Sequence, residues 1–270
     1  MPAATSAALA AIPPPPGNAF DLGPLTLRYY GVAVALGVLA AILLARRRYA
    51  ARGGDPETVD AVALWAVVAG LLGARLAWVS TNLDQVIERP IAVIAIWEGG
   101  LAFFGGLLLG GLAAVWQLRR RRASIADFAD AVAPAIPLGQ AIGRWGNYFN
   151  EELYGTATDL PWALELSTGE LVHPTFLYEM LGNLVIVAVL LAIGRRGVVH
   201  PGGLLLVYGI GYGLLRFSLE FIRTDGNIFI LGLSGNTYTA AGVLLASVVA
   251  LVWWQRTTPA VRRASGAPTR

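Results

Sequence analysis

A polar run at residues 143–155 carries the side chains in this chain that are best suited to bind an anion. Arg144 is followed closely by Asn147, Asn150 and Glu152, and apolar sequence precedes the run. An arginine guanidinium can hold a phosphate through two hydrogen bonds, and ionisable groups at membrane depth are costly and usually functional. The alternative is an interfacial loop whose asparagines only cap a helix. We expect this run to form part of a binding or catalytic site.

A second arginine, Arg216, lies well inside an apolar segment. Tyr212, Arg216, Glu220 and Arg223 follow one another at spacings of four, four and three, so they share one face of a helix. They could form an internal ion ladder that only holds the helix in place. Because intramembrane ionisable groups are functional by default, we favour a site. Two arginines that converge in an apolar bundle indicate a phospholipid headgroup as the ligand.

Three further features have structural explanations that compete with functional ones. His173 precedes Pro174 at a helix start, where it could be a base, a headgroup contact or a structural residue. Tyr30 opens an apolar helix, a position typical of interfacial anchors. The run Gly232–Gly235 resembles the serine motif of rhomboid intramembrane proteases, but no histidine follows Ser234. A serine without a base is a poor nucleophile, which excludes that function.

The composition predicts an integral membrane protein. The 270 residues are 56% hydrophobic and 14% charged, with a mean hydropathy of +0.61, whereas soluble domains carry roughly 25% charged residues. The absence of cysteine excludes a disulfide, a thiolate metal site and a cysteine nucleophile. All 20 basic side chains are arginines, and they fall at helix ends rather than on one face, which argues against a nucleic-acid partner.

The elements that must position these residues are apolar segments long enough to span a bilayer, which takes about 20 residues each. We predict an all-α bundle of seven transmembrane helices at about 28–46, 57–80, 100–118, 124–143, 175–194, 203–222 and 237–255. Pro134 and Pro137 interrupt the fourth. The pairs Gly106/Gly110 and Gly209/Gly213 favour close helix packing. Residues 1–20 are expected to be an extended lead-in, 21–256 the membrane domain, and 257–270 a basic, disordered cytoplasmic tail.

The arginines also predict an orientation. Fourteen of the twenty follow the first, third, fifth or seventh predicted helix. By the positive-inside rule these helix ends are cytoplasmic, so the N-terminus is outside and the C-terminus is cytoplasmic. The remaining arginines fall on the outer half of the bundle: Arg28, Arg75, Arg89, Arg144, Arg216 and Arg223. We therefore expect the active site to face the outer surface of the membrane.

Several blocks of the sequence, in order, resemble those of the prolipoprotein diacylglyceryl transferases. The polar run 143–155 is similar to the signature of that family, and the likeness extends over roughly residues 20–255. The other matching blocks are Tyr29–Gly31, Gly73–Arg75, Trp97–Gly100, His173–Glu179 and Tyr212–Arg216. One such block would be weak, but several in the family's order are specific.

The resemblance implies a bacterial plasma-membrane enzyme. It would transfer the diacylglyceryl group of phosphatidylglycerol to the lipobox cysteine of a prolipoprotein signal peptide, forming a thioether and releasing glycerol phosphate, with no cofactor and no metal. By this resemblance Arg144 and Arg216 hold the lipid phosphate. From the residues themselves, we expect Asn150 and His173 to be further substrate contacts. Tyr30, Asn147 and Gly155 match positions essential in the family, and Glu152, Tyr212 and Glu220 match further polar positions of the site.

The chain departs from the family at two positions. Phe104 stands where many members carry a histidine to which a general-base role is assigned, and Asn236 replaces a glutamine. A phenylalanine cannot accept a proton, so either no such base is obligatory or Tyr30, Glu152, His173 or Tyr212 substitutes. The competing function is a lipid- or anion-binding transporter that uses the same arginines. Transporters often contain internal repeats, and the two halves of this sequence have none.

Overall fold

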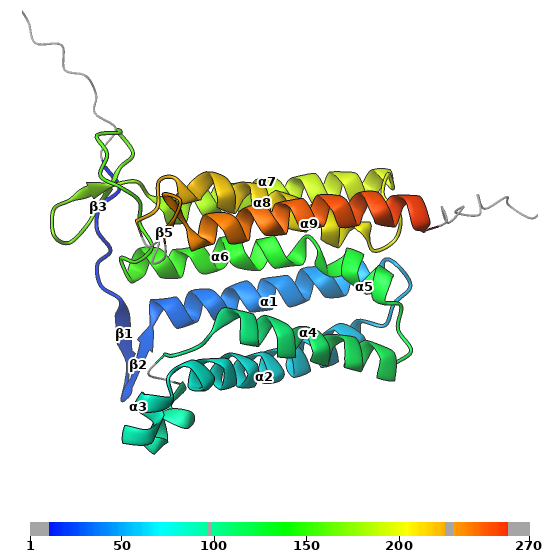
Figure 1. The fold of residues 1–270 in the computed structure, drawn as a ribbon, viewed down its shortest axis with the longest axis horizontal. Coiled ribbons are helices and arrows are strands. Elements are labelled where there is room, and N and C mark those ends of the chain that lie inside the picture. The colour runs from blue at the N-terminus through cyan, green and yellow to red at the C-terminus, as the bar shows by residue number, and fades with distance from the viewer. Residues whose placement is uncertain (1–10, 97–98, 225–228, 259–270) are drawn as a thin grey trace, which may run out of the picture. The chain divides into compact units, whose positions relative to one another are not determined.

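The computed structural model describes residues 11–96, 99–224 and 229–258, and this part of the chain is mainly helical (Figure 1). Its helices are α1 (Tyr29–Ala50), α2 (Pro56–Thr81), α3 (Leu83–Glu88), the 3₁₀-helix η1 (Pro90–Val93), α4 (Phe103–Arg120), α5 (Ile125–Val132), α6 (Ala135–Phe149), α7 (Thr175–Arg196), α8 (Gly203–Glu220) and α9 (Gly235–Thr257). The antiparallel strand pairs are short: β1 (Ala19–Leu22) with β2 (Leu25–Arg28), β3 (Leu164–Glu165) with β4 (Leu171–Val172), and β5 (Phe229–Ile230) with β6 (Leu233–Ser234).

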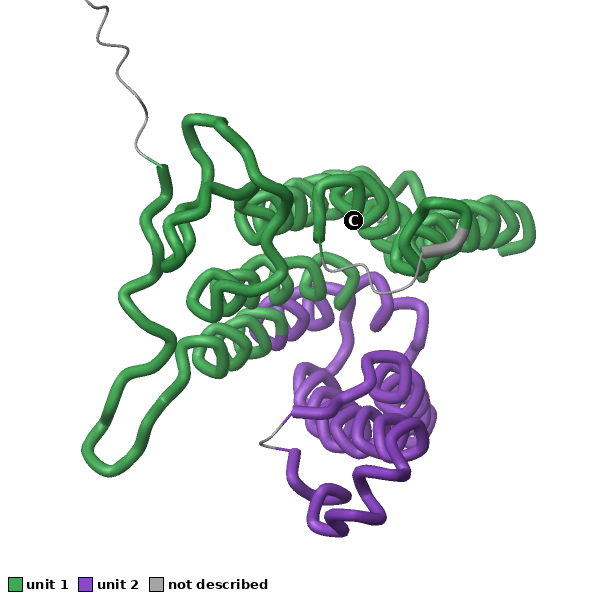
Figure 2. Tube along the Cα trace, turned by 60° about the vertical axis from the view of Figure 1, so that its left-hand side comes forward, with its two compact units in different colours: residues 1–41, 132–270 green, residues 42–131 purple. Residues whose placement is uncertain are grey.

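The chain divides into two compact units, which Figure 2 colours separately. The first unit comprises residues 1–41 and 132–270, and the second unit comprises residues 42–131, so the boundary falls inside α1. The division into residues 1–20, 21–256 and 257–270 stays a prediction. Residues 1–10 of the lead-in, Trp97 and Glu98 of one family block, and residues 259–270 of the tail, with Arg262, Arg263 and Arg270, lie outside the described residues.

In the first unit, consecutive helices from α6 to α9 pack side by side. A Cβ atom added to Gly213 would lie 2.8 Å from the backbone nitrogen of Leu244, and Gly209 lies against Ser247. These glycines therefore allow α8 and α9 to approach closely, which confirms the packing predicted for that pair. Gly37 of α1 likewise faces Gly139 of α6, where an added Cβ would lie 2.6 Å from the Gly139 carbonyl oxygen.

In the second unit, α2 packs against α4 along most of its length. A Cβ atom on Gly110 would lie 2.9 Å from the Ala66 carbonyl oxygen, and one on Gly106 would lie 3.1 Å from that of Gly70. The two backbones can approach this closely because neither glycine has a side chain, as is common between helices in lipid. The packing function predicted for Gly106 and Gly110 is confirmed.

The predicted fourth helix at 124–143 is wrong as a continuous element. The segment forms two helices, α5 and α6, separated by a turn at Ala133 and Pro134. Pro134 has no N–H to donate, and its ring disfavours helical geometry at the residue before it. Pro137 is tolerated because it lies in the first turn of α6, where no backbone donor is needed.

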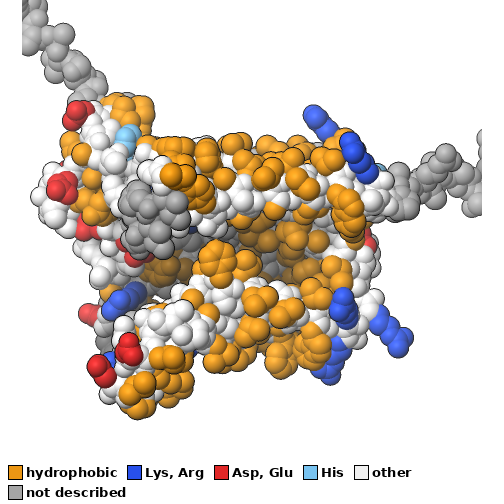
Figure 3. Space-filling model, viewed as in Figure 1, with side chains coloured by type: hydrophobic (Ala, Val, Ile, Leu, Met, Phe, Trp, Pro, Cys, Tyr) orange, Lys and Arg blue, Asp and Glu red, His pale blue; other side chains and the backbone are white. Residues whose placement is uncertain are grey.

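Four helices in the described part of the chain are long and apolar enough to cross a membrane, namely α1, α2, α7 and α9. Between 11% and 33% of the residues in their apolar windows are buried within the protein, so most of this apolar surface faces outward. Figure 3 shows hydrophobic side chains over the flanks of the helices. These features are those of a membrane-embedded protein. The count of seven spans stays a prediction, and α6, at 15 residues, is about 22 Å long and shorter than a hydrocarbon core.

Arginines lie at the C-terminal ends of helices in both units. In the first unit Arg195 and Arg196 end α7, and the end of α9 is tied to the same region by a hydrogen bond of 2.9 Å from Trp254 Nε1 to the Pro201 carbonyl oxygen. In the second unit Arg46, at the end of α1, contacts Asp60 of α2 at 2.5 Å. Arginine is therefore placed where the sequence analysis puts it, at helix C-termini. Which side of the membrane these ends face stays a prediction.

Candidate functional site

The first unit contains a cluster of ion pairs centred on Glu179 of α7. Its Oε2 lies 2.5 Å from Arg144 Nε of α6, and its Oε1 lies 3.0 Å from Arg216 Nη1 of α8. Arg223, just beyond α8, places Nη1 2.9 Å from the same Oε1. The Glu179 side chain is 5% exposed. A buried carboxylate must be paired to stay ionised, and here three guanidinium groups from separate segments pair with one.

Arg216 links this cluster to a second buried carboxylate. Its Nη2 lies 3.1 Å from Glu220 Oε2, one helical turn further along α8. The hydroxyl of Ser234 donates a hydrogen bond of 2.7 Å to Glu220 Oε1 and accepts one from the Thr237 backbone N–H at the start of α9. Ser234 therefore caps a helix and supports Glu220, which agrees with its exclusion as a nucleophile. Among the described residues, three arginines and two glutamates thus form one connected set of ion pairs.

The polar run 143–155 enters the cluster through a short hydrogen-bond relay. Arg144 Nη1 donates to Asn147 Oδ1 at 2.9 Å, and Asn147 Nδ2 donates to Glu152 Oε1 at 2.7 Å. Arg144 and Asn147 share one face of α6 because they lie three residues apart, and the chain turns at Glu151, which has φ of 49°. The structure thus brings together five residues predicted from sequence: Arg144, Asn147, Glu152, Arg216 and Glu220.

Tyr30 lies against the same part of α6. A Cβ atom on Gly146 would lie 2.7 Å from Tyr30 Cδ2, so the glycine makes room for the ring one residue before Asn147. Tyr30 is 39% exposed, and its neighbour Tyr29 stacks on Phe149 with ring centroids 4.5 Å apart. The tyrosine therefore borders the cluster and is also partly exposed, as an interfacial anchor would be.

Gly155 ties the polar run to the segment that carries Arg223. It forms an isolated antiparallel bridge with Arg223, and the next residue, Thr156, donates its N–H to the Ile222 carbonyl oxygen at 2.8 Å. A Cβ atom on Gly155 would lie 2.7 Å from His173 Cβ and 2.8 Å from the Ile222 oxygen. Only a glycine allows the three backbones to approach this closely. Gly155 thus helps to place Arg223 beside Glu179.

The other predicted site residues lie near these elements without joining the ion pairs. His173 Nδ1 lies 3.2 Å from the hydroxyl of Tyr178, which also accepts a hydrogen bond from Trp162. Tyr212 lies one turn before Arg216, and its ring is 6.0 Å from that of Tyr208. Asn150 ends α6 through its backbone N–H, which donates to the Gly146 carbonyl oxygen. Their functional assignments stay predictions.

Sequence reasoning does not place Glu179 in the site, and it groups Arg223 with Arg216 on one helical face without assigning it a function. The polar run and the α8 arginine were found because each concentrates charge within a few residues, whereas Glu179 is one acid at the start of a long apolar helix. A usable signal was present, since an ionisable residue inside a membrane helix requires a partner. Arg144, Arg216 and Glu179 meet only when α6, α7 and α8 pack together.

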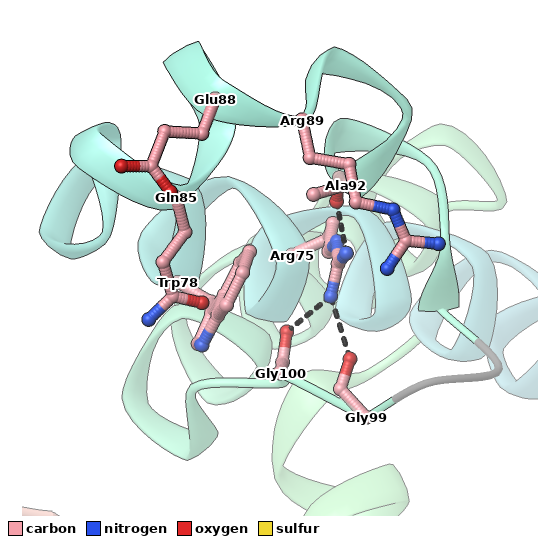
Figure 4. A pocket seen from close by; sticks show the side chains of 8 residues that line it. All are labelled: Arg75, Trp78, Gln85, Glu88, Arg89, Ala92, Gly99 and Gly100. Atoms are coloured by element: carbon pink, nitrogen blue, oxygen red, sulfur yellow. Dashed lines mark hydrogen bonds between the residues drawn. The ribbon is translucent and has the colours of Figure 1, made fainter.

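The second unit has a buried arginine of a different kind, shown in Figure 4. Arg75 of α2 donates to the carbonyl oxygens of Gly99 at 2.6 Å, Gly100 at 2.9 Å, Val93 at 3.2 Å, and Ala92. Its guanidinium also lies over the ring of Trp78, 4.4 Å from the centroid. A cavity of about 280 Å³ adjoins these residues. Four of the five N–H donors of Arg75 are thus directed at backbone carbonyls.

Comparisons with known proteins identify one family over most of the chain. Residues 17–253 match the family described as prolipoprotein diacylglyceryl transferase. A protein of Corynebacterium efficiens named phosphatidylglycerol–prolipoprotein diacylglyceryl transferase is 44% identical, over 89% of this chain and 82% of its own length. A protein of the same name from Rhodococcus jostii is 42% identical, over 89% of this chain and 74% of its own length. The protein numbered 2 under this name in Streptomyces coelicolor is 43% identical, over 90% of this chain and 81% of its own length.

The family match covers most of the chain, and it includes every residue of the Glu179 cluster. The relatives are similar over both units as well as over the blocks quoted from the sequence. This chain therefore belongs to the prolipoprotein diacylglyceryl transferase family.

Proposed function

We propose that this protein transfers the diacylglyceryl group of phosphatidylglycerol to the lipobox cysteine thiol of a prolipoprotein, and that the Glu179 cluster binds the lipid phosphate. The observation that carries the proposal is the convergence of Arg144 and Arg216, from two helices, on one carboxylate. Their side chains are 25% and 17% exposed, so both can reach a ligand. The phosphodiester of phosphatidylglycerol carries one negative charge, which two guanidinium groups are well suited to bind.

The two arginines keep donors for a phosphate. In the described part of the chain, Arg144 uses Nε for Glu179 and one N–H of Nη1 for Asn147, which leaves the second N–H of Nη1 and both N–H groups of Nη2. Arg216 uses Nη1 for Glu179 and Nη2 for Glu220, which leaves Nε and the second N–H of each terminal nitrogen. Guanidinium groups fixed by carboxylates are preorganised donors, and such donors stabilise charge as it develops on a leaving group.

The proposed reaction is a displacement at the glycerol carbon that bears the phosphate. The cysteine sulfur attacks this carbon as a thiolate, the carbon–sulfur bond forms, and the carbon–oxygen bond to phosphate breaks. The bond electrons stay on the phosphate oxygen, glycerol phosphate departs, and the thiol proton passes to a base or to solvent. A free thiol has a pKa near 8.5, and the positive potential of Arg144 and Arg216 favours its thiolate.

The proposed base is one of the groups named from the sequence. Of these, Glu152 is hydrogen-bonded through Asn147 to Arg144, and Tyr30 packs one residue away from Asn147. We further propose that the site faces the outer side of a bacterial plasma membrane, because the arginine-rich helix ends of the first unit lie opposite to the cluster. The end of α8 carries Glu220, whereas the α7–α8 turn beside Arg195 contacts the end of α9.

One mass measurement tests this function. The purified protein is incubated with phosphatidylglycerol vesicles and a synthetic lipobox peptide, and we expect a diacylglyceryl adduct on the peptide cysteine. The Arg216→Ala variant should form no measurable adduct, while Arg195→Ala, which removes an exposed arginine at the other end of α7, should match the unmodified protein. Transport of lipid across the vesicle membrane without any adduct would instead support the transporter.

A further inference from the structure

Glu179 contacts every arginine of the cluster, and the three arginines differ in accessibility. The side chains of Arg144 and Arg216 are 25% and 17% exposed, whereas that of Arg223 is 3% exposed. A ligand arriving from outside can therefore contact the first two, but Arg223 lies behind the carboxylate. Arg223 and Glu179 form a buried pair whose charges neutralise each other, and this pair lies next to the two arginines that face the substrate.

The pair joins α7 to the segment after α8, next to the backbone hydrogen bond from Thr156 to Ile222. Glu179 comes from α7, Arg144 from α6, and Arg216 and Arg223 from α8 and the segment after it. Glu179 Oε1 accepts from both Arg216 and Arg223, and its Oε2 contacts Arg144. An ionised carboxylate offers about four acceptor positions, so one group can fix the directions of three guanidiniums.

The charge of the cluster follows from the same residues. The Glu179 carboxylate offsets part of the positive charge of Arg144, Arg216 and Arg223, because it contacts all three guanidinium groups. The substrate phosphodiester is a monoanion at neutral pH. The product, a phosphate monoester, carries a charge of about −1.5 to −2 because its second pKa is near 6. A site with higher positive charge would bind the product more strongly than the substrate.

We propose that Glu179, held by Arg223, is the residue that sets the charge of this site so that it accepts a phosphodiester and releases a phosphate monoester. This inference rests on the function proposed above and deepens it. Glu179 is a positioning and specificity-determining residue, since it contacts Arg144 and Arg216 rather than the reacting atoms. Arg223 is its counter-ion and not a phosphate ligand.

A series of variants that changes the charge of the pair in single steps tests the proposal. Glu179→Gln adds one positive charge to the site, Arg223→Gln removes one, and the double variant restores the original value. Equilibrium binding of glycerol 1-phosphate to the purified full-length protein is measured at pH 7.5, together with inhibition of diacylglyceryl transfer by the same compound. Circular dichroism and gel filtration establish that each variant is folded.

We expect Glu179→Gln to bind glycerol 1-phosphate about tenfold more tightly, because one added charge a few ångströms away acts at moderate effective dielectric. Arg223→Gln should bind it about tenfold more weakly, and the double variant should return to within about threefold of the unmodified protein. Glu165→Gln, which removes an exposed carboxylate of β3, serves as the matched control and should not change binding.

Affinities that do not follow the charge of the pair would overturn the proposal. A double variant as impaired as Arg223→Gln alone would show that Arg223 binds the phosphate directly, which also overturns it. If Glu179→Gln does not fold, Arg223→Gln still tests the proposal. An affinity of this variant for glycerol 1-phosphate equal to that of the unmodified protein would contradict it. Failure of the proposed function has a separate signature, because the unmodified protein would then form no peptide adduct.

Discussion

Two arginines, Arg216 in the first unit and Arg75 in the second, are held in opposite ways. Arg216 contacts two carboxylates, and 17% of its side chain is exposed with N–H groups left over. Arg75 is 6% exposed and directs four donors at carbonyl oxygens, two in η1 and two in the segment between η1 and α4. The two carboxylates hold the Arg216 guanidinium in place and leave some of its N–H groups available to a ligand. The carbonyl oxygens around Arg75 instead occupy most of its N–H groups. The first arrangement suits binding, and the second suits holding a loop against a helix.

The largest effect should come from Arg144→Ala in the first unit. This change removes a phosphate donor and leaves part of the Glu179 charge uncompensated. We expect diacylglyceryl transfer to fall by about 100-fold or more, the range found when a preorganised donor to a developing anion is lost. Initial rates are measured with phosphatidylglycerol vesicles and a lipobox peptide. If the folded variant kept an activity within a few-fold of the unmodified protein, Arg144 would not be a phosphate ligand. The Glu179 cluster would then be structural, as the Arg75 site is.

Gly155→Ala should reduce transfer by about tenfold, a smaller effect. The added methyl group would lie 2.7 Å from His173 Cβ and 2.8 Å from the Ile222 carbonyl oxygen. The backbone next to Arg223 would therefore have to move, and small displacements near a site lower reaction rates strongly. The matched control is Gly143→Ala, since a Cβ atom there meets nothing within 4 Å. Equal rates for the two variants would contradict this account of Gly155.

Arg75→Gln should affect stability more than activity. Glutamine can replace one or two of the four hydrogen bonds, and a hydrogen bond from a charged donor contributes about 1.5–3 kcal/mol. We therefore expect the free energy of unfolding to fall by about 3 kcal/mol, with the transfer rate of the folded fraction within about threefold of normal. Thermal unfolding in detergent and rate measurements at low temperature check the two quantities separately. Loss of transfer without loss of stability would assign Arg75 to binding.

The smallest effect should come from Phe104→His. Phe104 lies at the start of α4 and is 66% exposed, so the change introduces a histidine of ordinary pKa near 6.5. A working general base contributes about 100-fold or more, and we expect a change of less than about threefold between pH 6 and 8. A rate that rises tenfold through pH 6.5 would show that the missing histidine matters and would give the second unit a part in the chemistry.

Much of the fold follows from short stretches of sequence. The long apolar helices and the arginines at their C-termini were placed within a few residues, because helix periodicity and capping are local properties. The fourth predicted helix failed at Pro134, a residue that had been recognised as an interruption, since a proline can either kink a helix or end it. The short strands of the connecting segments were not foreseen, because ladders of two residues leave almost no pattern.

The candidate site was predictable only in part, for a related reason. Arg144, Asn147 and Glu152 lie close together in sequence, and Arg216 and Glu220 share a helical face, so spacing alone grouped each set. Glu179 joins the two sets, and nothing near it in the sequence indicates which charges it meets. Gly155 was recognised through the resemblance, while its contact with the backbone beside Arg223 comes from the structure.

By itself the sequence determined that this is a membrane protein of the diacylglyceryl transferase family with arginines suited to a phosphate. Those conclusions depend on composition, on residue spacing and on motifs, each of which is contained within a few turns of chain. Only the tertiary structure decided that a buried glutamate contacts Arg144, Arg216 and Arg223, and that Arg75 directs four of its five N–H donors at carbonyl groups. Ion pairs between helices depend on which faces meet when the helices pack, and that is a property of the whole fold.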